Sequence, residues 1–155
     1  MDYLVLKWLH ILSATFLFGT GLGSAFYMFF ANRTRNVQAI SVVAGYVVIA
    51  DWLFTTPTVI FQPLSGLYMA HRLGFPWSSD WIAWSLALYV LAGACWLPVV
   101  WLQLRMRDLA RVAAAANAPA LPPLYWRYAR IWTTLGVPAF VAMVLIYYLM
   151  VLKPA

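Results

Sequence analysis

The sequence LHILSATFLFGTGLGSAFYMFFA, residues 9–31, contains no acidic side chain and only one basic side chain, that of His10. A helix crosses the hydrocarbon core of a bilayer with about 20 consecutive apolar residues, so this stretch is long enough to span a membrane. It lacks the small-residue cleavage site that ends a secretory signal peptide. We therefore predict that it is retained as a first transmembrane helix, over about residues 3–30.

The second apolar stretch covers residues 37–73. As one helix it would reach about 55 Å, well beyond one membrane core. Pro57 and Pro63 are expected to kink it, because proline interrupts the helical hydrogen-bond ladder. Asp51 is a plausible boundary: the residues after it suffice to span, while those before it would tilt or lie along the inner interface.

Two more apolar stretches predict a third helix over about residues 81–104 and a fourth over about residues 128–152. Between them, residues 105–127 are polar and rich in Ala and Pro, and we expect one long loop there. The pattern predicts an all-α membrane protein, a four-transmembrane-helix bundle whose second helix is long and proline-kinked. We expect a single domain over residues 1–155.

The composition agrees with a membrane protein. Of 155 residues, 65% are hydrophobic and only 9% are charged, whereas soluble domains have roughly a quarter charged residues. The formal net charge of +6 is spread over the ends of apolar stretches and does not form one basic face. This distribution argues against nucleic acid as a partner and favours membrane lipids.

The arginines predict how the chain sits in the membrane. The first connection carries Arg33 and Arg35, and the second offers only Arg72 beside Asp80. The third is marked or flanked by Arg105, Arg107, Arg111, Arg127 and Arg130. Because Lys and Arg accumulate in cytoplasmic loops, we predict that both termini are non-cytoplasmic. Lys7 and Lys153 argue weakly for the opposite orientation.

Two histidines and a methionine are candidate metal ligands. His10 lies at membrane depth, where an ionisable side chain is costly and often functional. His71 ends the second helix and, in this topology, lies on the same outer side about one helical turn deeper or shallower. Imidazole and thioether sulfur are both axial ligands of haem, so His10 could pair with His71 or with Met69. The alternatives are a hydrogen-bonded or interfacial histidine and a methionine that only packs.

Other polar residues have functional and structural explanations. Lys7, Arg72 and Lys153 fall near the same outer end, where they could bind porphyrin propionates or simply reach the membrane surface. Asp51 could relay protons or bind an ion, but we expect it to pair with an arginine such as Arg33 or Arg130. Gly19, Gly21 and Gly23 are expected to allow close packing of helices or of a flat macrocycle.

Four stretches resemble a known family: KWLHILSATFLFGTGLGSAF, TTPTVIFQPLSGLYMA, WLPVVWLQLRMR and YYLMVLKP. Together they are similar to an uncharacterised family of predicted bacterial integral membrane proteins. That family in turn resembles, distantly, the CopD-type copper-resistance membrane proteins and the HemJ-type protoporphyrinogen oxidases. The resemblance covers essentially the whole chain.

The resemblance implies a bacterial inner-membrane protein that forms homo-oligomers. In HemJ-type proteins a histidine early in the first helix is implicated in haem binding, and the matching position is His10. The Lys153-Pro154 ending also matches theirs. Where that type has an Asn-Glu-Pro element opening its last helix, this chain has Leu135, Gly136, Val137 and Pro138. Protoporphyrinogen oxidation is therefore not carried over.

Three functions remain open from the sequence. The first is a membrane redox protein, an oxidoreductase or an electron carrier with its own redox partner, that binds haem b through His10 near the non-cytoplasmic side. The second is copper handling, which the CopD-like resemblance suggests, although the methionines form no MxxM cluster. The third is a non-catalytic membrane subunit. We expect the first.

Overall fold

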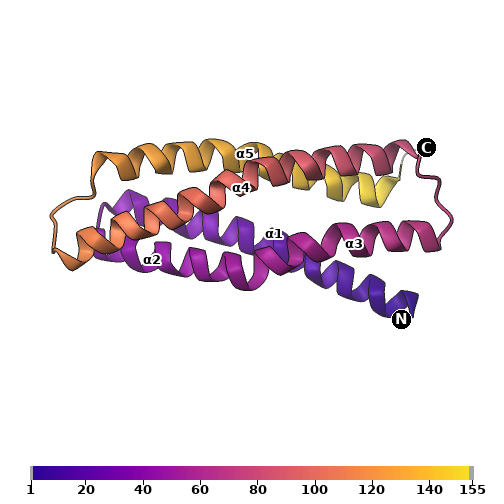
Figure 1. Cartoon of the computed structure of the whole chain (residues 1–155), viewed down its shortest axis with the longest axis horizontal. Helices are drawn as coiled ribbons and strands as arrows, with labels where there is room; N and C mark the ends of the chain where they lie inside the picture. The colour runs from indigo at the N-terminus through magenta and orange to yellow at the C-terminus, as the bar shows by residue number, and fades with distance from the viewer. Residues whose placement is uncertain (1, 154–155) are drawn as a thin grey trace.

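The computed structural model describes residues 2–153. Within them, four helices are long and apolar enough to cross a membrane. They are α1 (Tyr3–Thr34), the continuous helix made of α2 (Val37–Ala50), η1 (Asp51–Thr55) and α3 (Thr56–Arg72), then α4 (Asp80–Ala115) and α5 (Pro123–Leu152). Figure 1 shows these helices running along one long axis, with the start of α1 and the end of α5 at the same end of the bundle. The four-helix prediction is confirmed.

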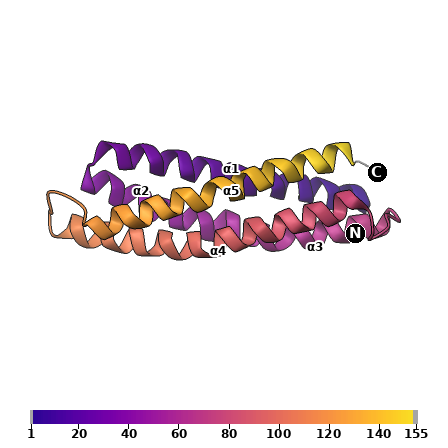
Figure 2. The ribbon, with the colours of Figure 1, turned by 90° about the horizontal axis from the view of Figure 1, so that it is seen from above.

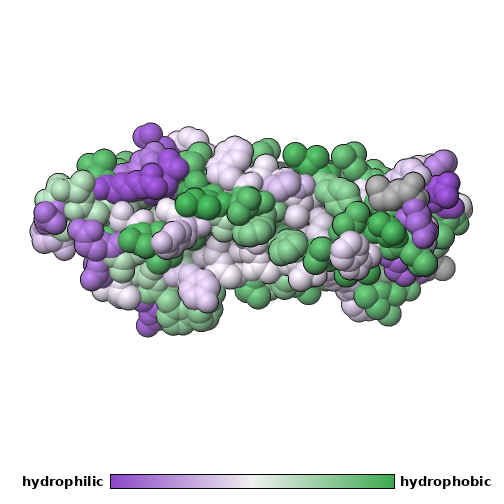
Figure 3. All heavy atoms as spheres, turned by 90° about the horizontal axis from the view of Figure 1, so that it is seen from below, coloured by the Kyte–Doolittle hydropathy of each residue, from purple (hydrophilic) through white to green (hydrophobic). Residues whose placement is uncertain are grey.

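The outer surface is apolar along the middle of the bundle and polar at its ends (Figure 3). Large hydrophobic side chains such as Leu53, Val90 and Leu97 are more than half exposed, and a soluble protein rarely exposes so many. In a membrane this surface faces lipid tails.

Helices α4 and α5 lie side by side along most of their length (Figures 1 and 2). At the end of the bundle where α1 meets α2, they enclose a core with α2 in which Ile40, Met106 and Tyr125 are almost fully buried. Small residues on the same faces, Ala44 and Ala110, let the helix backbones approach. The Tyr125 hydroxyl donates to Asn32 Oδ1 at 2.7 Å, which ties α5 to the end of α1.

The second helix is interrupted by a π turn, η1. Pro57 has no N–H to donate, so the regular hydrogen-bond ladder fails just before it. The Thr56 N–H and hydroxyl both donate to the carbonyl of Asp51, the hydroxyl at 3.0 Å. The Thr58 hydroxyl lies 2.7 Å from the Phe54 carbonyl and 2.9 Å from that of Thr55. The threonine hydroxyls therefore add hydrogen-bond donors to the carbonyls of the wide turn.

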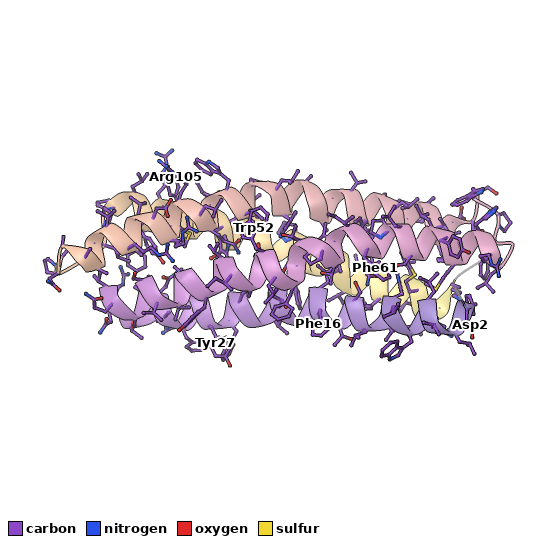
Figure 4. All side chains as sticks on the ribbon, turned by 60° about the horizontal axis from the view of Figure 1, so that its bottom comes forward. Asp2, Phe16, Tyr27, Trp52, Phe61 and Arg105 are labelled. Atoms are coloured by element: carbon purple, nitrogen blue, oxygen red, sulfur yellow. The ribbon has the colours of Figure 1, made fainter. Side chains whose placement is uncertain are left out.

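The expectation that residues 37–50 lie along the inner interface is wrong. Helix α2 runs along the long axis of the bundle beside α1 and α4, and α3 continues from it along the same axis (Figure 1). Trp52, in the π turn, lies about midway along the bundle (Figure 4). Asp51 is therefore a mid-length residue and not a boundary residue.

The prediction of a long loop over residues 105–127 is also wrong. Helix α4 continues to Ala115 and α5 begins at Pro123, so the connection covers only residues 116–122. The alanine-rich segment continues the helix because alanine has the highest helix propensity. Proline is well suited to the first turn of a helix, and Pro123 opens α5 there.

Candidate functional site

His10 is held by a hydrogen bond to α3. Its Nδ1 lies 2.7 Å from Ser65 Oγ. The Ser65 hydroxyl has one proton, and its oxygen lies 2.6 Å from the Phe61 carbonyl, which can only accept. Ser65 Oγ must then accept from His10 Nδ1–H. This tautomer leaves the lone pair on Nε2, the state in which imidazole binds a metal.

Two further residues of α3 position the histidine. The Gln62 side-chain amide donates to the His10 backbone carbonyl at 2.8 Å. A Cβ atom at Gly66 would lie 3.3 Å from His10 Cε1, so the ring packs against a position where even a methyl group would be tight. Gln62, Ser65 and Gly66 were not predicted from the sequence as partners of His10. Their i, i+3, i+4 spacing, which places them on one helix face, was the available signal.

His71 and Met69 lie elsewhere on α3. The His71 ring is exposed and stacks on Trp77, with 6.1 Å between ring centroids. Met69 is buried. His71 is six positions after Ser65 in α3, about 9 Å further along the helix axis. Neither candidate contributes to the hydrogen bonds around His10.

The three cations predicted to lie near His10, namely Lys7, Arg72 and Lys153, make no ion pair with any described residue. Within residues 2–153 the one ion pair joins Arg107 to Asp108. Lys7 and Arg72 are exposed. Lys153 places its Nζ over the rings of Phe75 and Trp81, at 5.2 and 5.8 Å from their centroids, a favourable cation–π geometry.

A second polar site lies deeper, around Asp51. The pairing predicted for this residue with Arg33 or Arg130 is wrong: Asp51 is buried at 6% exposure and makes no ion pair in the described chain. The side chains of Thr55 and Trp96 lie beside its carboxyl group. These residues line a cavity of about 410 Å³ bounded by α1, the η1–α3 segment, α4 and α5.

Four polar atoms that line this cavity have no hydrogen-bond partner. They are Asp51 Oδ2, Thr55 Oγ1, Trp96 Nε1 and Trp132 Nε1. Unsatisfied buried polar atoms are rare, and each asks for an explanation such as a ligand or a catalytic role. The sequence singled out Asp51, but not the tryptophans, which it left as ordinary helix residues.

The glycines of α1 do not pack as expected. A Cβ atom at Gly19, Gly21 or Gly23 would meet nothing within 4 Å in this chain. The prediction that these glycines allow close packing of helices within one chain is therefore wrong. Gly21 instead lines the cavity, together with Gly93 of α4 and Gly136 of α5.

Ligand clusters of the type that hold a metal ion by protein side chains alone are absent from residues 2–153. No group of three or more His, Cys, Asp or Glu side chains is close enough to do so. Cys95 is a buried free thiol. A macrocycle that brings its own equatorial nitrogens needs only one or two axial side chains, so the lone His10 suits that kind of group.

The family comparison covers nearly the whole chain. Residues 4–154 match the family described as predicted integral membrane protein (DUF2269). No curated protein and no solved structure matches the chain, so the comparisons add no evidence for the distant likeness to CopD-type and HemJ-type proteins. The chain belongs to DUF2269, a family of predicted integral membrane proteins.

Proposed function

We propose that this membrane protein binds haem b and acts in electron transfer or redox catalysis, with His10 Nε2 as an axial ligand. The observation that carries the proposal is the hydrogen bond from His10 Nδ1–H to Ser65 Oγ at 2.7 Å. A metal-binding histidine commonly donates its other ring N–H to an oxygen, which fixes the tautomer and the ring orientation. Haem bound there would supply one-electron chemistry at its iron.

The residues around His10 fit this role. Ser65 holds the ring in one tautomer, and Gln62 fixes the backbone of α1 at this position. The ring is only partly buried. Lys7, Arg72 and Lys153 are proposed partners for the propionates, and His71 or Met69 is proposed as a second axial ligand.

The proposed location is the non-cytoplasmic side of a bacterial inner membrane. The His10 end of the bundle is opposite the end that carries the first and third connections, where most arginines lie. Arginine-rich connections stay cytoplasmic, which would leave His10 toward the outer leaflet.

Copper handling receives less support. A copper ion held by protein side chains needs several nitrogen or sulfur ligands, and residues 2–153 contain no group of three or more His, Cys, Asp or Glu side chains that could hold one. A purely structural subunit would account for the hydrogen bond between His10 and Ser65, which joins α1 to α3. It would not account for the unsatisfied polar atoms around Asp51.

The test is a reduced-minus-oxidised absorption spectrum of the purified protein, with haem added in a titration. We expect a haem-b spectrum in the wild type and its loss in His10→Ala. In Ser65→Ala the haem should bind about 10–100-fold more weakly, as for other partners of metal-bound histidines. A folded wild type without a haem spectrum, or a His10→Ala variant with an unchanged one, would contradict the proposal.

The His71→Ala variant shows the number of ligands. An unchanged spectrum means that His10 is the only histidine on the iron, and a shifted one means that His71 is the second ligand. Size-exclusion chromatography and far-ultraviolet circular dichroism of each variant separate loss of haem from loss of the fold.

A further inference from the structure

The cavity around Asp51 lies between two places where α1 and α5 touch. Toward the outer end, the Tyr147 hydroxyl donates to the Ala14 carbonyl at 2.8 Å, and Phe18 packs on Phe140 with 5.2 Å between centroids. Toward the other end, the Tyr125 hydroxyl bonds to Asn32. Apart from these places α1 and α5 contact each other far less than α4 contacts α5. The cavity fills this interval.

Small residues create the empty space. Gly21 of α1, Gly93 of α4 and Gly136 of α5 all line the cavity, and a Cβ atom at any of them would meet nothing within 4 Å. Glycine is a poor helix former in water-facing or buried helices. Three glycines around one cavity therefore keep its volume of about 410 Å³ free for something other than this chain.

The polar atoms define what could fill the space. Asp51 and Thr55 both line the cavity. Their exposures are only 6% and 4%, and Asp51 Oδ2 and Thr55 Oγ1 have no hydrogen-bond partner. Trp96 of α4 lies beside the Asp51 carboxyl group, but its indole N–H makes no hydrogen bond of ordinary geometry. The indole N–H of Trp132, on α5, also has no partner. The site offers a carboxyl oxygen that accepts and two indole groups that only donate.

A matching ligand must donate to Asp51 and accept from an indole N–H. A lipophilic cation would pair with the carboxylate but could not accept from either tryptophan. An acyl chain would fill the volume and leave all four polar atoms unsatisfied. A phenolic hydroxyl does both, since its O–H donates while its oxygen accepts. Aromatic walls, including Phe18, Phe140 and both tryptophans, favour an aromatic ring between them.

We propose that this cavity binds a lipid-soluble hydroquinone, with a ring hydroxyl between Asp51 and Trp96. The motivating juxtaposition is a buried acid, two unpartnered indole N–H groups and three glycines around one apolar cavity in the membrane-spanning bundle. It deepens the proposed function by naming the class of molecule that would exchange electrons with the haem, and only that redox role rests on the haem. Binding itself does not.

The test is equilibrium binding of a decyl-substituted benzohydroquinone, kept reduced under argon, to the full chain in nanodiscs, measured by calorimetry. The same ring and tail without hydroxyls is the comparison ligand. We expect it to bind at least about tenfold more weakly, because the hydrogen bonds made by the two ring hydroxyls are lost. Equal binding of the two ligands would show an apolar lipid slot and overturn the proposal.

Three variants locate the binding site. Asp51→Leu and Gly21→Leu should each weaken hydroquinone binding by at least about tenfold, the first by removing the acceptor and the second by filling the cavity. Gly19→Leu is the matched control on the same helix. It is exposed, does not line the cavity and has the same open space around its Cβ, so binding should stay within about twofold. Unchanged binding in both cavity variants would overturn the proposal.

Two further binding measurements distinguish failure of the hydroquinone proposal from failure of the haem proposal. The His10→Ala protein should bind the hydroquinone as the wild type does, because His10 does not line the cavity. If haem is absent but the hydroquinone binds, only the haem proposal fails. Tetraphenylphosphonium is the probe for the cation class, and its tighter, Asp51-dependent binding would overturn the hydroquinone assignment.

Discussion

Asp51 occupies a position where an acidic side chain is expected to destabilise the fold. It is buried without a counter-ion at mid-length of a membrane-spanning bundle, and one of its carboxyl oxygens has no partner. Burying such a polar group without a hydrogen-bond partner costs free energy. Proteins tolerate this cost chiefly at functional sites.

We therefore expect Asp51→Leu to raise the free energy of unfolding by about 1–3 kcal/mol, because the unsatisfied carboxyl group is removed. Thermal unfolding in detergent measures the change. Asp108→Asn is the control: its exposed ion pair with Arg107 contributes only about 0–1 kcal/mol. A clear loss of stability in Asp51→Leu would mean that the carboxyl group stabilises the fold.

His10 illustrates how far a single residue could be predicted. Its depth in the first apolar stretch predicts from the sequence alone that it is functional. Its partner Ser65 could not be found from the sequence, because a contact between α1 and α3 depends on how α3 is rotated about its own axis. That rotation is set by the π turn, which no hydrophobic period shows.

At the scale of elements, the interruption of the second helix was predictable and its form was not. Pro57 indicated a break, but the sequence did not show that the hydroxyls of Thr56 and Thr58 would donate to carbonyls of the turn while the helix continued along the same axis. The same weakness affected α4. Polar residues and prolines near residues 105–127 suggested a loop, although the high helix propensity of arginine, leucine and alanine extends α4 to Ala115.

Thr58→Val tests the role of the threonine hydroxyls. Valine keeps the shape but leaves carbonyls of the π turn without their donor, so we expect a loss of about 1 kcal/mol in thermal unfolding. Thr134→Val is the matched control, since its hydroxyl donates to Arg130 within a helix without a π turn and its loss should cost less. Equal effects would show that the π turn needs no such support.

At the scale of the whole molecule, two polar ends enclose an apolar middle (Figure 3). The arginine-bearing end also carries aromatic contacts: the Arg35 guanidinium lies 4.0 Å from the Trp126 ring centroid. Arg105 extends away from the bundle beside Trp101 (Figure 4). Arginines held at the surface in this way suit a membrane interface rich in anionic lipid.

The orientation in the membrane can be measured with single cysteines in a Cys95→Ala background. Ser78 lies in the connection before α4, and Ala116 lies in the connection before α5. By the distribution of arginines, Ser78→Cys should react with an impermeant maleimide on whole cells. Ala116→Cys should react only in inverted vesicles. The opposite pattern would place both termini in the cytoplasm and His10 toward the inner leaflet.

The π turn also sets the register between the two candidate sites. One residue advances an α-helix by about 100° of rotation, so the extra residue in the Asp51–Thr55 turn turns all of α3 relative to α2. Deleting one residue there would restore an unbroken α-helix and swing Ser65 about a quarter of a turn away from His10. The single extra residue of the π turn therefore sets the rotation of α3 at which Asp51 lines the cavity while Ser65 contacts His10.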